Sequence, residues 1–430
     1  MKKKFAAVMV ILVLVLSLAA CGSKNSGSGV TVITTENTNE NAVSQDTVVT
    51  ESSESAVTTA NTSSGGALDT SDLFSNRDLT QTPDLTDAVY YTLSGGEDIS
   101  ITKAGVYVFS GSASEVTVTV DAGDDDKVQI VLNGASITNK DFPCIYVKNA
   151  DKVFVTTVKG TESSLTVTGT FVSDGNTNTD AVIFSKDDLV LNGTGILNVT
   201  SYYGNGITSK DDMKITGGTY NVKSALDAFE ANDSISVSDG TFNIATNKDG
   251  FHCENDEAEG TVTISGGTFS INGGSDGIQA CSLLQIDGGT MTIQAPEGLE
   301  AAYILINDGD ININSSDDGV NVSKKSSSVT TPTFEINAGS LSIAMSGNDV
   351  DGIDANGNII VSGGTIDITY PQQGPSESFD YDGSAEFNGG TVIINGTEVS
   401  EIPSAMMGGG MHGGMNGGMQ GGFGGRDGRF

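Results

Sequence analysis

The stretch Ile264-Ser265-Gly266-Gly267-Thr268-Phe269-Ser270-Ile271 decides the fold of this chain. It joins an apolar strand to an alternating strand through a turn of two glycines and a threonine. The same pattern occurs nine times, and its central glycine recurs after 20 to 30 residues. Such a repeat, built from period-2 strands without a helical segment, is typical of a β-solenoid, which stacks equivalent residues along a rod. The central glycines are Gly193, Gly218, Gly240, Gly267, Gly289, Gly309, Gly339, Gly364 and Gly390.

Alternate residues of each strand are predicted to face the interior. In the quoted repeat these are Ile264, Phe269 and Ile271, and the equivalent positions of other repeats are also apolar. Further strand-like segments precede the clear repeats. We expect them to form an N-terminal cap, because an open end would expose unpaired backbone and apolar side chains. The sequence therefore predicts an all-β fold, a parallel β-helix over residues 67–400 with an N-terminal cap.

Both ends of the chain are predicted to be appendages. Residues 1–20 have a basic start and an apolar run, and the Leu-Ala-Ala that precedes Cys21 is similar to a bacterial lipobox. We expect cleavage before Cys21 and lipidation of its thiol, which would anchor the protein to the extracellular face of the bacterial cell membrane. An ordinary secretory signal is the alternative. Residues 21–66 predict a disordered Ser/Thr/Asn-rich tether, and residues 401–430 predict a flexible Gly/Met-rich tail.

The composition limits the possible partners. The chain has 55 acidic and 20 basic residues, which gives a net charge of −35. This argues against nucleic acid, whose phosphates are bound through Lys and Arg. The acidic surface is compatible with cation binding or with solubility alone. We expect no nucleic-acid partner and a monomer.

An acidic residue recurs at one place in most repeats, and Asn205 takes that place in one of them. Stacked strands lie about 4.8 Å apart, so neighbouring carboxylates would repel by roughly 1 kcal/mol in water and by more near a protein surface. Ca²⁺ accepts about six to eight oxygen ligands and would relieve this repulsion. The alternative is that each Asp-Gly is an ordinary turn whose Asp caps backbone amides. The predicted metal ligands are Asp180, Asp227, Asp249, Asp276, Glu297, Asp318 and Asp351.

A polar side chain follows most of these acidic positions by three residues. The residues on either side of it are apolar or small and must point inward, so this side chain is predicted to point outward. The positions together predict a polar strip along the rod, next to the acidic column. The predicted carbohydrate-binding residues are Glu230, His252, Gln279, Glu300, Asn321 and Asp354.

Several ordered phrases carry a family resemblance: Asp78-Leu79-Thr80-Gln81-Thr82, Asp87-Ala88-Val89, Ile101-Thr102-Lys103-Ala104-Gly105-Val106-Tyr107, Lys127-Val128-Gln129-Ile130-Val131-Leu132-Asn133-Gly134, Ile183-Phe184-Ser185-Lys186-Asp187-Asp188-Leu189 and the Asp-Gly-Ile repeats. Over about residues 70–400 the chain resembles the clostridial carbohydrate-binding β-helix lipoprotein family. The resemblance implies a right-handed parallel β-helix, similar in architecture to polysaccharide lyases. It also implies calcium-dependent binding of cellulose-type and acidic, galacturonate-like glycans, with ligands at Asp227, Asp249, Asp276, Asp318 and Asp351. Asn205, Glu297 and Lys248 depart from the pattern.

We therefore expect a non-catalytic surface lipoprotein that binds plant-type or cell-wall polysaccharide with Ca²⁺. The first alternative is a calcium-dependent polysaccharide lyase acting on pectic polyuronate, which needs a base to remove the proton next to the uronate carboxyl group. No arginine lies in the repeats, so its candidate bases are Lys186, Lys210, Lys248 and Lys324. The second alternative is a structural adhesion stalk without saturable sugar binding.

Overall fold

The computed structural model describes residues 32–33, 67–255, 257–348, 350–372 and 375–403. The predicted signal peptide, Cys21, most of the predicted tether and the tail from residue 404 lie outside the described residues. All regular secondary structure in the described part of the chain is β-strand. That part contains no helix long and apolar enough to span a membrane.

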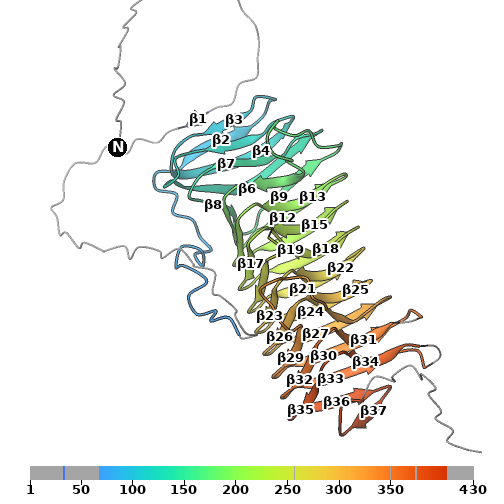
Figure 1. Ribbon diagram of the computed structural model, residues 1–430. Coiled ribbons are helices and arrows are strands. Elements are labelled where there is room, and N and C mark those ends of the chain that lie inside the picture. The colour runs from blue at the N-terminus through green and yellow to red at the C-terminus, as the bar shows by residue number, and fades with distance from the viewer. Residues whose placement is uncertain (1–31, 34–66, 256, 349, 373–374, 404–430) are drawn as a thin grey trace, which may run out of the picture.

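The strands form one 25-stranded sheet and one 12-stranded sheet, both almost entirely parallel (Figure 1). The larger sheet consists of two columns of strands, which we call the first and second stacks. The columns are joined by two long strands, β4 (Gly105–Ser114) and β6 (Lys127–Asn139). In β6, residues 127–132 pair with β8 and residues 136–139 pair with β9, so the strand belongs to both stacks. We call the 12-stranded sheet the third sheet.

Besides parts of β4 and β6, the first stack contains β2 (Val89–Leu93), β8 (Lys152–Thr157), β11 (Asp188–Gly193), β14 (Asp212–Ile215), β17 (Ser234–Val237), β20 (Thr261–Ile264), β23 (Leu283–Ile286), β26 (Tyr303–Ile306), β29 (Thr333–Ile336), β32 (Asn358–Val361) and β35 (Ala385–Phe387). The second stack adds β9 (Glu162–Val167), β12 (Ile196–Ser201), β15 (Thr219–Ser224), β18 (Thr241–Thr246), β21 (Thr268–Asn272), β24 (Thr290–Ala295), β27 (Asp310–Ser315), β30 (Ser340–Met345), β33 (Thr365–Thr369) and β36 (Thr391–Ile394).

The third sheet consists of β3 (Ile99–Ile101), β5 (Val118–Asp121), β7 (Ile145–Asn149), β10 (Ala181–Ser185), β13 (Asn205–Ser209), β16 (Phe229–Ala231), β19 (Phe251–Cys253), β22 (Asp276–Ala280), β25 (Glu297–Ala301), β28 (Val320–Val322), β31 (Asp351–Ala355) and β34 (Glu377–Tyr381). The short strands β1 (Val32–Ile33) and β37 (Thr397–Val399) pair antiparallel with β2 and β36. The predicted all-β class and its long parallel sheets are thus present. The right-handed coil and the N-terminal cap stay predictions.

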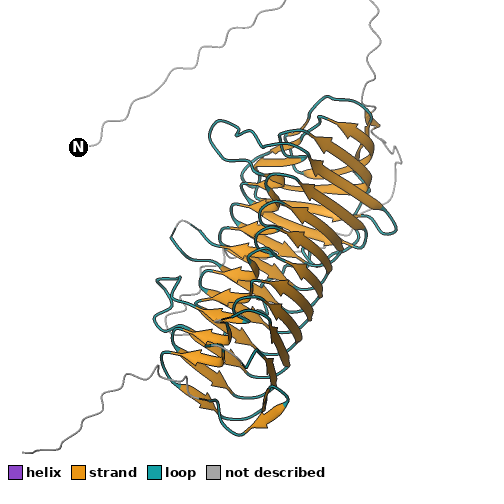
Figure 2. Cartoon of the chain, turned by 90° about the vertical axis from the view of Figure 1, so that its right-hand side faces the viewer, coloured by secondary structure: helices purple, strands orange, loops and turns teal. Residues whose placement is uncertain are grey.

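From β13 onward the chain passes through the third sheet, the first stack and the second stack in turn, as a β-solenoid requires (Figure 2). The inward residues of all three columns form one continuous apolar core. Aromatic rings stack inside it from turn to turn. The ring centroids of Phe229 and Phe251 lie 4.8 Å apart, and those of Phe242 and Phe269 lie 4.6 Å apart. The core therefore holds each repeat in register with the next.

Glycine serves two purposes in the repeat. Gly267 has a φ of 105°, which β-carbon-bearing residues rarely adopt, and it makes the turn between the first and second stacks. Gly277, in contrast, lies inside β22. A β-carbon there would come within 2.4 Å of Ile293 Cγ2 and 2.5 Å of the Gly298 carbonyl oxygen. The glycines that follow Asp249, Asp276, Asp318 and Asp351 are thus needed for close packing rather than for a positive φ, and the interpretation of these Asp-Gly pairs as ordinary turns was wrong on this point.

Residues 67–88 lie along the flank of the first stack and form what we call the strap (Figure 1). At its beginning, the Leu68 amide donates to Gln285 Oε1 at 2.7 Å. Further along, Gln81 Nε2 donates to the Thr216 carbonyl at 2.9 Å, and Asp78 is completely buried. The strap therefore runs from the middle of the rod toward its N-terminal end. The sequence did not predict this flank contact.

Candidate functional site

The outer face of the third sheet carries the residues that we predicted to bind metal and carbohydrate. Strand pairing aligns Asp276 with Glu297 and Asp351 with Glu377. Applied to every turn, this register defines a column that we call the acidic ladder: Asn205, Asp227, Asp249, Asp276, Glu297, Asp318, Asp351 and Glu377.

One predicted ligand is not in the ladder. The strand β10 pairs with β13 so that Ala181, not Asp180, lies opposite Asn205. Asp180 is therefore displaced by one residue, and its carboxylate accepts a hydrogen bond from Asn178 Nδ2. The sequence alignment matched Asp180 and Ala181 to the Asp-Gly pairs of the other repeats, but in this turn Ala181 occupies the ladder position. Glu377 was missed because its strand lacks the Asp-Gly signal.

The predicted outward residues form a second column. Pairing places Glu230 beside His252, His252 beside Gln279, and Gln279 beside Glu300. Asp380 extends this column beyond Asp354 and was not predicted. We call the complete column the outer strip: Thr208, Glu230, His252, Gln279, Glu300, Asn321, Asp354 and Asp380.

Most ladder side chains use one oxygen to bind the next turn of the backbone. Asp249 Oδ1 accepts from the Asp276 amide at 2.9 Å, and Asp318 Oδ1 accepts from the Asp351 amide at 2.8 Å. Asn205 performs the same role toward the Asp227 amide. The predicted capping of backbone amides is therefore real, although it occurs between turns. It leaves the second carboxylate oxygen for another partner.

Two groups of ligand atoms lie where the ladder and the outer strip meet. One contains Asp227, Asp249 and His252, and the other contains Asp276 with Glu297 and Glu300. Within each group the candidate ligand atoms lie within 4.8 Å of one another. The second group offers oxygen atoms alone, which suits a hard cation such as Ca²⁺.

The first group already has positive neighbours. His252 Nδ1 lies 2.8 Å from Asp249 Oδ2, and Lys248 Nζ lies 3.7 Å from Asp227 Oδ2. Burial alone would lower the pKa of His252, but its hydrogen bond to Asp249 and the nearby carboxylates raise that pKa overall. These neighbours favour the protonated imidazole, whose charge would offset part of the negative charge of this group. Its need for a metal cation is correspondingly smaller.

The second group is less well neutralised. Burial, followed by the charges of Asp249, Glu300 and Glu297, raises the pKa of Asp276 to about 8. Further along the ladder, burial and neighbouring aspartates raise the pKa of Asp318 to about 7. These carboxylates bind protons strongly because negative charge is crowded where solvent access is poor. A cation bound here would reduce the repulsion between these carboxylates.

Lys325 is the cation that the structure places next to this group. Its Nζ donates a short hydrogen bond to Glu300 Oε2. The loop that carries Lys325 is held by Glu259, whose carboxylate accepts from the hydroxyls of Ser326 and Ser328 at 2.7 Å each. Sequence analysis missed Lys325 because it lies on this loop and not in a repeated position. One lysine faces three carboxylates here.

A third acidic group lies away from the ladder and contains Asp188, Asp211 and Asp212. Lys152 Nζ lies 3.5 Å from Asp188 Oδ2 and also faces the buried Asp78 of the strap. Through Asp188, this group borders the ion pairs that Lys152 makes with the strap. We do not consider it a metal site.

The fold and the site can now be compared with known proteins. A family described as "Carbohydrate-binding domain-containing protein" matches residues 95–302 and again residues 297–399. The chain belongs to this family of carbohydrate-binding domain proteins. Its two matched segments together contain the complete acidic ladder and the complete outer strip.

One relative is itself called a carbohydrate-binding domain-containing protein and comes from Acetivibrio thermocellus. It is 36% identical over 129 residues, which cover 30% of this chain and 45% of the relative. The match thus spans less than half of that protein's length. A solved structure of a polysaccharide lyase-like protein from C. thermocellum, a gadolinium derivative, has a TM-score of 0.48 and 29% sequence identity. It covers 53% of this chain and 96% of its own.

Proposed function

We propose that this carbohydrate-binding domain protein binds acidic, galacturonate-like polysaccharide through Ca²⁺ held on the acidic ladder, without cleaving it. The observation that carries the proposal is the buried group of Asp276, Glu297 and Glu300, which has Lys325 as its neighbouring cation. A Ca²⁺ ion would be held by these oxygens and would leave coordination positions for a sugar carboxylate, because Ca²⁺ accepts about six to eight oxygen ligands.

Charge supports a bridging cation. The chain carries a net charge of −35, so its surface repels a polyuronate unless cations lie between the two. The outer strip lies beside the ladder and would supply hydrogen bonds to sugar hydroxyls. Thr208 and Lys210 already hold Glu230 in place, at 2.9 and 3.0 Å from its two carboxylate oxygens.

The lysines near the site do not favour the lyase alternative. A catalytic base has to lose its proton near neutral pH. Burial would lower the pKa of Lys325, but Glu300 and the other carboxylates raise it overall, so this lysine keeps its proton. Burial would also lower the pKa of Lys186, but the neighbouring Tyr146 and Asp174 raise it overall, so this lysine keeps its proton as well. The charged lysines instead act as counterions of the carboxylates.

The handedness of the fold, the oligomeric state, the membrane anchor and the glycan are also proposals. We infer a monomeric right-handed parallel β-helix with an N-terminal cap, lipidated at Cys21 and held at the extracellular face of the bacterial membrane. Its ligand would be plant-type or cell-wall polysaccharide, with cellulose as a further possible glycan. The lipobox-like sequence before Cys21 and the ordered family phrases support these inferences.

Calorimetric titration of the protein with oligogalacturonate, with Ca²⁺ and with chelator, tests the proposal. We expect saturable binding with Ca²⁺ and none in chelator. Asp276→Asn together with Glu300→Gln should abolish the calcium-dependent part. Binding that is equal in chelator would refute the calcium bridge, and no binding in either condition would favour the adhesion stalk. Release of unsaturated product from polygalacturonate would show a lyase.

A further inference from the structure

Two long connections lie at one corner of the rod, where the chain passes from the third sheet to the first stack. Most connections at this corner are short, and β22 ends at Ala280 just before β23 begins at Leu283. The connection from β19 to β20, in contrast, runs from Cys253 to Thr261, and that from β28 to β29 covers residues 323–332. Two turns of the rod with short connections lie between them, yet residues of the two long connections meet.

The two connections are joined through Glu259. Its carboxylate accepts hydrogen bonds from the Ser326 and Ser328 hydroxyls, and from the Ser328 amide at 3.1 Å. Ser326 is buried, and Val329 of the same loop is buried against Tyr303 and its apolar neighbours on the first stack. The loop from β28 to β29 is therefore anchored by a charged contact and by an apolar one. We call Glu259, Ser326 and Ser328 the bridge.

The bridge lies directly beside Lys325 in the chain, and Lys325 reaches the group of Asp276, Glu297 and Glu300. We call these three carboxylates the calcium group. The Lys325 ammonium donates to Glu300, whose side chain is only 8% exposed. A salt bridge is usually weakened by the entropy that is lost when long side chains are held in one geometry. Because the bridge already fixes the backbone next to Lys325, less entropy is lost here, and the ion pair is correspondingly stronger.

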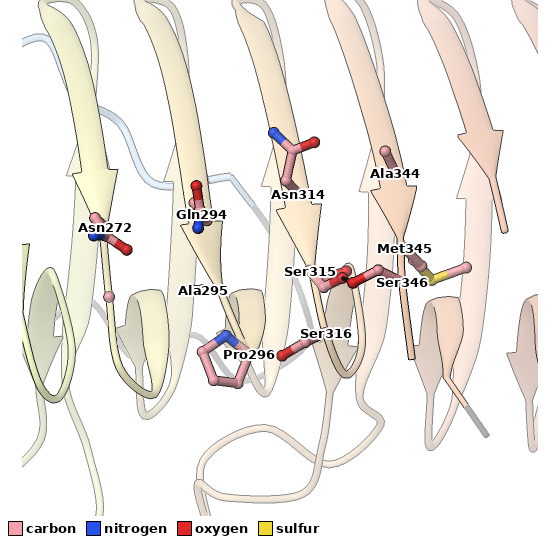
Figure 3. Close-up of a pocket in the computed structure, with 11 residues that line it drawn as sticks. Asn272, Gln294, Ala295, Pro296, Asn314, Ser315, Ser316, Ala344, Met345 and Ser346 are labelled. Carbon is pink, nitrogen blue, oxygen red and sulfur yellow. Dashed lines mark hydrogen bonds between the residues drawn. The ribbon is translucent and has the colours of Figure 1, made fainter. Parts of the chain in front are cut away.

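The opposite corner of the third sheet, next to Glu297, is uncharged. There the second stack leads into the third sheet, and Pro296 directly precedes Glu297. Pro296, Gln294 and Ser316 line a pocket of about 360 Å³ at this corner (Figure 3). None of the described residues that line the pocket carries a charge. The lysine that contacts the calcium group therefore comes from the side of the bridge.

We propose that Lys325 is a built-in competitor of Ca²⁺ at the calcium group, and that the bridge sets how strongly it competes. A Ca²⁺ ion held by Glu300 would lie next to the Lys325 ammonium, and the two positive charges would repel each other. Ca²⁺ therefore has to displace Lys325. A site that is open for only a fraction of the time binds its ligand more weakly by that fraction. The inference rests on the proposed calcium site and adds a regulator to it, because the bridge residues are not among the proposed ligands.

Acetylation of lysines in the parent protein tests whether Ca²⁺ displaces Lys325. The neighbouring Lys324 is exposed and serves as an internal reference. In EDTA, acetic anhydride should modify Lys325 more slowly than Lys324, because the ammonium of Lys325 is held by a carboxylate. With saturating Ca²⁺, the rate at Lys325 should approach the rate at Lys324, which tandem mass spectrometry measures. An unchanged ratio of the two rates, while calorimetry shows that Ca²⁺ binds, would overturn the competitor and leave the proposed calcium site standing.

A pair of variants tests the bridge. Glu259→Ala removes the hydrogen bonds that hold the loop, so we expect about threefold tighter Ca²⁺ binding in calorimetric titration. Glu257→Ala is the matched control, because it removes the same charge from the same connection and lies outside the bridge. The control should bind Ca²⁺ equally well or slightly more weakly, since a negative charge attracts the ion.

In a Lys325→Gln background, Glu259→Ala and Glu257→Ala should have the same effect, because the competitor is gone. A gain from Glu259→Ala that persists in this background would show that the bridge does not act through Lys325. Absence of a gain over Glu257→Ala in the parent protein would overturn the role of the bridge as well. If the parent protein binds no Ca²⁺ at all, both this inference and the proposed calcium site are overturned.

Discussion

The outer faces of the third sheet and of the second stack are built by the same repeat and carry opposite chemistry. The third sheet presents crowded carboxylates, some of them paired with lysines or a histidine. The pKa of Asp276 is raised, whereas that of Asp249, which is hydrogen-bonded to His252, is lowered. The second stack presents threonine, serine and amide side chains without a charge over three consecutive strands. A solenoid separates these chemistries because each position of the repeat always faces the same side. One rod can thus present two unlike surfaces along its length.

The largest expected loss of stability comes from disturbing the close packing around Gly277, which follows the ladder residue Asp276. Gly277→Val should destabilise the protein by about 3 kcal/mol, because the side chain would collide with Ile293 and the Gly298 carbonyl. In the turn between the first and second stacks, Gly289→Ala should cost only about 1 kcal/mol, the usual strain of a positive φ. Urea denaturation of both variants measures the difference. Equal losses would show that the two faces depend on glycine in the same way.

Calcium should act on the acidic face alone. A ligand bound only by the folded state adds about 2.7 kcal/mol at a hundredfold excess over its Kd. We therefore expect thermal stability to rise with Ca²⁺ and to return to its starting value in chelator. Asp276→Asn with Asp318→Asn should remove most of this response, whereas Asn272→Ala, on the outer face of the second stack, should keep all of it. An unchanged melting temperature in the parent protein would contradict the calcium site.

In the absence of Ca²⁺, the stability of the protein should fall as pH rises. The folded pKa of Asp276 is raised to about 8, above its unfolded value of about 3.9. The folded state thus holds the proton more tightly, and the free energy of unfolding falls as pH rises from about 4 to 8. We expect a loss of at least about 1 kcal/mol, the value of a one-unit shift. Chemical denaturation in EDTA across this range measures it, and Asp276→Asn should flatten the profile.

Lys325 and Ca²⁺ should compete for Glu300. Lys325→Gln removes the resident cation, so we expect about tenfold tighter Ca²⁺ binding and lower stability in chelator. Lys223→Gln removes a charge of the same sign from the second stack and serves as the control. Calorimetric titration with Ca²⁺ compares the two variants. Weaker calcium binding by Lys325→Gln would show that Lys325 organises the site and does not compete for it.

The smallest effect is expected on the uncharged outer face of the second stack. Thr290 is exposed, so Thr290→Ala should change the free energy of unfolding by no more than about 0.5 kcal/mol and leave the calcium response intact. Thermal denaturation with and without Ca²⁺ measures both quantities. A large loss would mean that Thr290 and the threonines aligned with it, Thr241 and Thr268, contribute to folding.

The repeat made the strands, the core and most of the ladder predictable. Stacked positions such as Asp249 and Asp276 recur at a fixed place, so their alignment could be read directly. Asp180 was misplaced because an Asp-Ala pair in that turn is shifted by one residue. Lys325 could not be predicted, because it lies on a loop between β28 and β29 and reaches Glu300 only in the fold.

The strap has a consequence for how the rod is oriented. Leu68 contacts Gln285 at mid-length of the first stack, whereas β1, which precedes the strap in the chain, pairs with β2 at the N-terminal end of the same stack. The chain before residue 89 therefore contacts the first stack at two levels. Neither of these contacts lies on the third sheet or the second stack. The acidic and the uncharged outer faces can then both meet a polymer that lies along the rod.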